Sequence, residues 1–160
     1  MNGLLFRTRV AVLWVAAAVA ASASLLFYLL MPGALAQVLD GTMEGEPLND
    51  AMGFFFAALV LIPVVMAALA MLVGDRVNRY LNLIVGLLFA LFATYGVVSH
   101  VSDGEFNGHV LMAALGGLLT YLITGLSAVG LRRSASAGPT PALGTPAPAE
   151  ETRARASTPA

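Results

Sequence analysis

Four side chains of metal-binding type lie close together in the second half of the chain, and they are the first candidates for chemistry. They are His100, Asp103, Glu105 and His109. Imidazole nitrogens and carboxylate oxygens bind zinc and related ions, but this spacing matches no established metal motif. We therefore predict an ordinary solvated loop with neither metal nor cofactor, and we retain the four side chains only as candidate ligands.

A second set of polar side chains falls inside long apolar runs. Thr94, Thr120, Tyr121 and Thr124 belong to it. A threonine hydroxyl can donate to a carbonyl of its own helix, whereas the Tyr121 hydroxyl must reach a neighbouring helix, a trapped water or a ligand. We favour a structural hydrogen bond, and a polar path lining a cavity is the alternative.

The third candidate set is the densest polar cluster that touches an apolar run. It contains Arg76, Asn78, Arg79 and Asn82. Asn78 and Asn82 are four positions apart and share a helix face, so they can bond a neighbouring helix. The arginines can anchor the chain at a membrane surface, and the whole cluster could also bind an anionic lipid headgroup or a partner protein.

The chain lacks the groups on which most enzymes and ion-coupled carriers depend. It contains no cysteine, which excludes disulfides, thiol redox chemistry and thiolate metal sites. Its apolar runs hold no Asp, Glu, Lys or Arg, and His100 lies only at the edge of one, whereas coupled carriers usually place ionisable residues inside their spans. We predict no catalytic residues and a protein that is not an enzyme.

The elements that carry these residues are apolar enough to cross a membrane. Of 160 residues, 59% are hydrophobic and only 11% are charged. A bilayer core requires about 20 mostly apolar residues for each helix. Uncharged runs of at least that length predict an all-α polytopic membrane protein, an antiparallel bundle of four transmembrane helices within residues 1–133, with spans at about 10–31, 51–74, 80–101 and 109–131.

Orientation follows from the basic residues. All eight are arginines, and they fall before the first span, between the second and third, and after the fourth. Short cytoplasmic segments retain basic residues, so both termini are predicted to be cytoplasmic. The Arg-only, Ala-rich composition favours a bacterial plasma membrane, and the chain offers no basic surface for nucleic acid. A secretory signal cleaved after Ala36 is the alternative for the first span, which is longer than an ordinary signal segment.

Turn and cap residues predict the connections. Pro32 and Gly33 end the first span, residues 34–39 can form one or two turns of interfacial helix, and Asn49 or Asp50 caps the second span. The loop between these segments is expected to be compact and irregular. Residues 134–160 are rich in Ala, Ser and Pro and predict a disordered cytoplasmic tail.

The connection between the second and third spans is short, essentially Gly74 and Asp75. Such a turn predicts that these two helices are antiparallel neighbours and tightly paired. Pro63 is expected to kink the second span near its middle. Small and weakly polar residues recur four positions apart on the third and fourth spans, a pattern typical of close helix packing in membranes.

One stretch resembles a known family. The segments that carry the resemblance are Met31-Pro32-Gly33, Gly41-Thr42-Met43-Glu44-Gly45, Ala57 to Pro63 with Met66, and Asn78-Arg79-Tyr80-Leu81-Asn82 with Gly86. They resemble the DUF6326 family of small four-helix prokaryotic membrane proteins of unknown function. Tyr80 replaces a usual Trp, and Leu61 replaces an acidic residue of many members. The resemblance implies a retained first span and supplies no activity.

These observations favour a non-catalytic integral membrane protein that binds lipid or a partner subunit, and a homo-oligomer is one form of that hypothesis. A small carrier or pore for a neutral or weakly polar solute is the alternative, and it would require a hydrated cavity touching Thr94 and Tyr121. An intramembrane enzyme is a distant third hypothesis.

Overall fold

The computed structural model describes residues 3–104 and 106–136, and it is an all-α fold with a small hairpin. The elements in chain order are α1 (Gly3–Leu29), α2 (Ala34–Leu39), β1 (Thr42–Met43), β2 (Glu46–Pro47), α3 (Asp50–Leu72), α4 (Asp75–Ser102) and α5 (Gly108–Ser136). Within the described ranges, α1, α3, α4 and α5 are long and apolar enough to cross a membrane. The all-α membrane prediction is therefore confirmed for this part of the chain.

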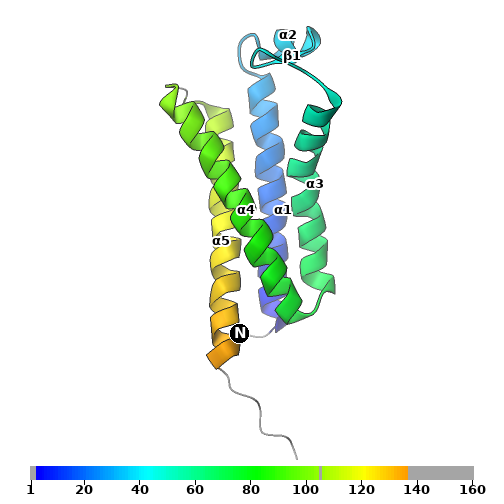
Figure 1. Ribbon diagram of the computed structural model, residues 1–160, viewed down its shortest axis with the longest axis vertical. Coiled ribbons are helices and arrows are strands. Elements are labelled where there is room, and N and C mark those ends of the chain that lie inside the picture. Colours follow the sequence, from blue (N-terminus) through cyan, green and yellow to red (C-terminus); the bar gives the residue numbers. More distant parts are fainter. Residues whose placement is uncertain (1–2, 105, 137–160) are drawn as a thin grey trace, which may run out of the picture.

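The two ends of the molecule differ in charge. The start of α1, the turn between α3 and α4, and the end of α5 lie at one end, where Figure 1 places the N-terminus. We call it the basic end, because it holds the arginines of the described residues. The opposite, acidic end carries α2, the hairpin and the connection from α4 to α5, with the carboxylates Asp40, Glu44, Glu46, Asp50 and Asp103.

Local signals fix the elements at the acidic end. The Asn49 side chain accepts a hydrogen bond from the Met52 amide at 3.0 Å, which caps α3. Strands β1 and β2 pair antiparallel across the two residues Glu44 and Gly45, which both have positive φ, 54° and 83°. Positive φ at both central residues is the signature of a type I′ hairpin turn. The expected irregular loop thus contains a defined hairpin, which sequence reasoning missed.

The helices do not form the expected pairs. Helix α1 packs against both α3 and α5, and α5 packs against α4. Helices α3 and α4 meet near their short turn and then diverge, so that their acidic ends lie well apart (Figure 1). The predicted tight pairing of these two helices is therefore wrong. A short turn fixes only where two helices start, and packing surfaces decide the angle between them.

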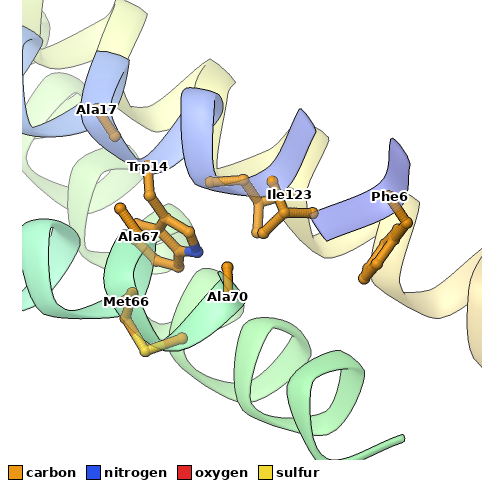
Figure 2. Close-up of a cluster of buried hydrophobic side chains, with 8 residues drawn as sticks. Phe6, Trp14, Ala17, Met66, Ala67, Ala70 and Ile123 are labelled. Carbon is orange, nitrogen blue, oxygen red and sulfur yellow. The ribbon is translucent and has the colours of Figure 1, made fainter. Parts of the chain in front are cut away.

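The buried apolar core lies toward the basic end. Its buried apolar cluster includes Phe6, Val10 and Trp14 of α1, and Met66 and Ala70 of α3. Figure 2 shows the Trp14 indole lying over the side chains of α3. The same ring meets the Phe89 ring of α4 edge to face at 5.9 Å between centroids. This cluster joins α1, α3, α4 and α5 in one half of the molecule.

Small residues bring α4 and α5 close together. A Cβ added to Gly86 of α4 would lie 2.7 Å from Thr124 Oγ1, and one added to Gly117 of α5 would lie 2.9 Å from Ala93 Cβ. Neither position therefore accepts a side chain without displacement of its neighbour. This close contact between α4 and α5 is of the kind by which helices associate in membranes, where packing of small residues replaces the hydrophobic effect.

Helix α5 continues through Ser136, beyond the expected fourth span. The first three positions of the predicted disordered tail are therefore helical. The rest of that prediction, residues 137–160, lies outside the described residues.

Candidate functional site

The amides of Asn78 and Asn82 form an internal network that links three helices. Trp14 Nε1 of α1 donates to Asn82 Oδ1 at 2.5 Å. Asn82 Nδ2 donates to the Asn78 carbonyl at 2.6 Å and also to Asn78 Oδ1. Asn78 Nδ2 donates to the Ala70 carbonyl of α3 at 2.9 Å. With exposures of 1% and 0%, both asparagines are buried as interhelical partners, away from lipids and partner proteins.

The two arginines of the same cluster have different surroundings. Arg79 donates through Nη1 to the Gly130 carbonyl of α5, and its guanidinium lies 5.0 Å from the centre of the Phe6 ring. Arg76 is exposed. Nearby, Arg7 Nε and Asp75 Oδ1 form an ion pair at 2.7 Å between α1 and α4. These contacts join α4 to α1 and α5 at the basic end. Arg76 is the exposed member of the cluster.

Tyr121 bonds a neighbouring helix. Its hydroxyl lies 2.9 Å from Thr94 Oγ1 of α4, and Thr94 also donates to the Ala90 carbonyl at 2.8 Å. Thr120 and Thr124 donate to carbonyls of their own helix, each at 2.8 Å. Tyr121 is 44% exposed on the outside of the helix pair. Neither Tyr121 nor Thr94 lines the two cavities described next, whereas Thr120 lines one of them.

A cavity of about 420 Å³ lies among α1, α3, α4 and α5, in the half of the molecule toward the acidic end. We call it the deep cavity. It exists because α3 and α4 diverge there, and it reaches Pro63, Phe89 and Thr120 near the middle of their helices. Most of its lining side chains are Ala, Leu, Met and Phe. Its volume falls within the range of ordinary ligand pockets, about 300–1,000 Å³.

A second cavity of about 580 Å³ lies at the surface of the acidic end, and we call it the rim cavity. Its lining is more polar and includes Gln37, Tyr95, Ser99 and Asp103. The residues that line both cavities are Glu44, Phe92, Gly96, His100 and His109. The two cavities therefore adjoin. Their lining is more polar in the rim cavity and mostly apolar in the deep cavity.

An aromatic contact crosses the gap between α3 and α4. The rings of Phe55 and Phe92 meet edge to face at 5.4 Å between centroids, and Phe55 also contacts Phe56 at 5.6 Å. All three rings line the deep cavity. Phe55 and Phe92 are 43% and 45% exposed, so they form the side of the cavity that faces away from the bundle.

Two of the predicted metal candidates meet at the boundary of the cavities. The His100 and His109 rings lie edge to face at 5.3 Å between centroids. His109 Nδ1 lies 2.8 Å from Ser24 Oγ and 2.9 Å from the Ser24 carbonyl of α1. Because a carbonyl can only accept, Nδ1 carries the proton, and a neutral ring then keeps Nε2 as an acceptor.

One of the two remaining candidates lies beside these cavities. Asp103 lines the rim cavity, and Glu105 lies outside the described residues. Within residues 3–104 and 106–136, no three His, Asp or Glu side chains are placed to hold a metal ion.

Sequence reasoning missed the participation of the hairpin in this site. Glu44 and Glu46 line the deep cavity together with Met43, although the hairpin and the helices that it covers are far apart in sequence. Gly45 was the available signal, because a two-residue hairpin turn requires positive φ at its central residues and glycine accepts it without strain. That signal could place the turn but not its position beside the cavity among the helices.

Comparison with known proteins gives one match. A model of a family of unknown function, DUF6326, matches residues 6–127. No curated protein and no solved structure matches the chain. The match covers most of the chain and reaches from the first turns of α1 into the last third of α5. The chain therefore belongs to the DUF6326 family.

Proposed function

We propose that this protein is a non-catalytic membrane protein that binds a membrane-resident amphiphile in the two adjoining cavities. The observation that carries the proposal is their polarity: a mostly apolar cavity of about 420 Å³ opens into a more polar one at the acidic end. An apolar chain would occupy the deep cavity and a polar head the rim cavity. Such a division matches the two halves of an amphiphile.

The surrounding structure supports the interpretation of the cavities as a binding site and not as imperfect packing of the helices. Within the described residues, the basic half holds the buried apolar cluster around Trp14, and the Trp14 indole and the two buried asparagine amides have internal hydrogen-bond partners. The acidic half is instead held open by the divergence of α3 and α4. A cavity confined to one half of a well-packed bundle is a place where a ligand can enter from the membrane.

The orientation of the site follows from charge. With the arginines of the basic end retained in the cytoplasm, the acidic end and the rim cavity face the extracytoplasmic side of a bacterial plasma membrane. The polar head would then lie near the outer lipid headgroups, and the chain would extend toward the membrane midplane. Phe55 and Phe92 would form the lateral side through which the chain enters from the bilayer.

Substitution of Gly96 by leucine tests the proposal. Gly96 lines both cavities, and an added Cβ there would meet nothing within 4 Å, so Gly96→Leu can be accommodated and fills space that the ligand needs. Gly125→Leu is the matched control, because Gly125 also has nothing within 4 Å and lines neither cavity. Both changes replace glycine in a helix with a better helix former.

The measurement is mass spectrometry of the molecules that co-purify in mild detergent. We expect the wild type and Gly125→Leu to retain one amphiphile far above its share of total lipid, and Gly96→Leu to lose most of it. Equal retention by all three proteins, or retention of nothing beyond bulk lipid by the wild type, would contradict the proposal. A co-purifying protein in place of an amphiphile would instead favour partner binding.

A further inference from the structure

Apart from the histidines, the charged groups that line the two cavities have one sign. Glu44 and Glu46 line the deep cavity, and Glu44 and Asp103 line the rim cavity. Among the described residues, no arginine lines either cavity, and the chain contains no lysine. A cavity mouth with carboxylates and no fixed cation attracts positive groups and repels phosphate, sulfate and carboxylate groups.

The neutral polar groups of the site also favour a ligand whose head group donates hydrogen bonds. Nδ1–H of His109 points to Ser24, and a neutral ring then leaves Nε2 as an acceptor. Carboxylate oxygens are acceptors only. A primary ammonium group offers three N–H donors and a positive charge, which complements both features.

We propose that the site selects amphiphiles with a cationic ammonium head, and that Glu44 is the specificity-determining residue. This inference rests on the proposed function. Glu44 occupies the first central position of the hairpin turn, with φ of 54°, a position that Asn, Asp and Gly normally occupy. Its amide donates to Gln37 Oε1 of α2 at 3.1 Å, which holds the turn in place over the rim cavity.

This position allows a substitution that removes the carboxylate without disturbing the hairpin. Glu44→Asn removes the carboxylate and introduces a residue that prefers positive φ, so the hairpin should remain intact. The amide bond to Gln37 uses the backbone and is kept. Asp40→Asn is the charge-matched control, because Asp40 is exposed at the same end of the molecule and lines neither cavity.

The experiment compares two photoactivatable probes in phosphatidylcholine nanodiscs. Both probes have the same long alkyl chain with a diazirine, and one ends in a primary amine and the other in a carboxylic acid. After irradiation, peptide mapping by mass spectrometry gives the labelling of the residues that line the deep cavity. The ratio of amine to acid labelling reports head selection, and the amount of labelling reports occupancy of the cavity.

We expect the wild type and Asp40→Asn to favour the amine, and Glu44→Asn to lower the amine-to-acid ratio roughly two- to five-fold, the range of a partly exposed ion pair. Equal labelling by both probes, a preference for the acid, or an unchanged ratio in Glu44→Asn would overturn the head-group proposal while leaving the cavity site intact. Failure of the proposed function looks different: neither probe would label the cavity above the lipid-facing surface, and Gly96→Leu would change nothing.

Discussion

Removal of the Asn82 side-chain amide should weaken the bundle, because this amide has two buried side-chain partners. In Asn82→Leu, the Trp14 indole N–H loses its acceptor and Asn78 Oδ1 loses its donor, and all three side chains are at most 1% exposed. An unsatisfied buried polar group costs about 1–3 kcal/mol, whereas interhelical hydrogen bonds in membranes average about 0.6 kcal/mol. Between these limits, we expect a loss of about 2 kcal/mol of unfolding free energy.

A double-mutant cycle separates the hydrogen bond from side-chain packing. Trp14→Phe removes the donor, so combining it with Asn82→Leu leaves no orphaned indole N–H. We expect the double variant to be about 1 kcal/mol more stable than the sum of the single effects predicts. The assay is unfolding in mixed micelles with increasing dodecyl sulfate, followed by far-ultraviolet circular dichroism, because Trp14 is the sole tryptophan and cannot report on its own removal. An Asn82→Leu protein within about 0.5 kcal/mol of wild type, or strict additivity in the cycle, would refute the reasoning.

The remaining predictions use the same unfolding assay. Tyr121→Phe should cost less than about 0.5 kcal/mol, because the hydroxyl is partly exposed and Thr94 keeps its bond to a backbone carbonyl. Gly86→Ala should cost about 1–2 kcal/mol, because the new Cβ would lie 2.7 Å from the Thr124 hydroxyl, which is itself bonded to its helix. Asp75→Asn should cost less than about 0.5 kcal/mol, and added salt should shrink the effect, because its ion pair is partly exposed.

Each of these three predictions has an outcome that would contradict it. Gly125→Ala is the control for Gly86→Ala, since its Cβ meets nothing within 4 Å, and equal stability of the two variants would show that α4 and α5 are not in close contact. A loss above about 1.5 kcal/mol in Tyr121→Phe would mean that this hydroxyl supports more than the bond to Thr94. A large effect of Asp75→Asn that salt does not diminish would place this ion pair in a drier setting than the structure gives it.

The sequence was most informative where hydrophobicity, caps and small residues act locally. The apolar runs predicted the long helices because burial in a bilayer requires them, and Asn49 caps α3 as expected. The four-residue spacing on α4 also predicted most of its buried face, since Asn78, Asn82, Gly86 and Ala90 are buried, whereas Thr94, the next residue of that row, is exposed. These inferences depend on residues within one helix.

The sequence was least informative where several elements meet. Divergence of α3 from α4 depends on how α3 packs against α1 and how α4 packs against α5, which neither the turn at Gly74 nor the kink expected at Pro63 could reveal. Placement of Glu44 at the cavity mouth depends on the hairpin fold and on the bond to Gln37. Consequently, the candidate residues chosen from the sequence include the histidines and Asp103 of the site but not Glu44 and Glu46.

Methionine methyl groups provide the most direct test that the deep cavity binds an amphiphile. Met52 and Met112 line that cavity, Met66 is 4% exposed in the closely packed cluster, and Met71 is 43% exposed near the basic end. With ¹³C-methyl methionine in deuterated nanodiscs, titration of a protonated long-chain amine would produce contacts to each methyl group that it reaches. We predict saturable nuclear Overhauser contacts at Met52 and Met112, none at Met66, and only non-saturating ones at Met71. Contacts at Met52 and Met112 that are absent, or that match those at Met71, would contradict the central claim.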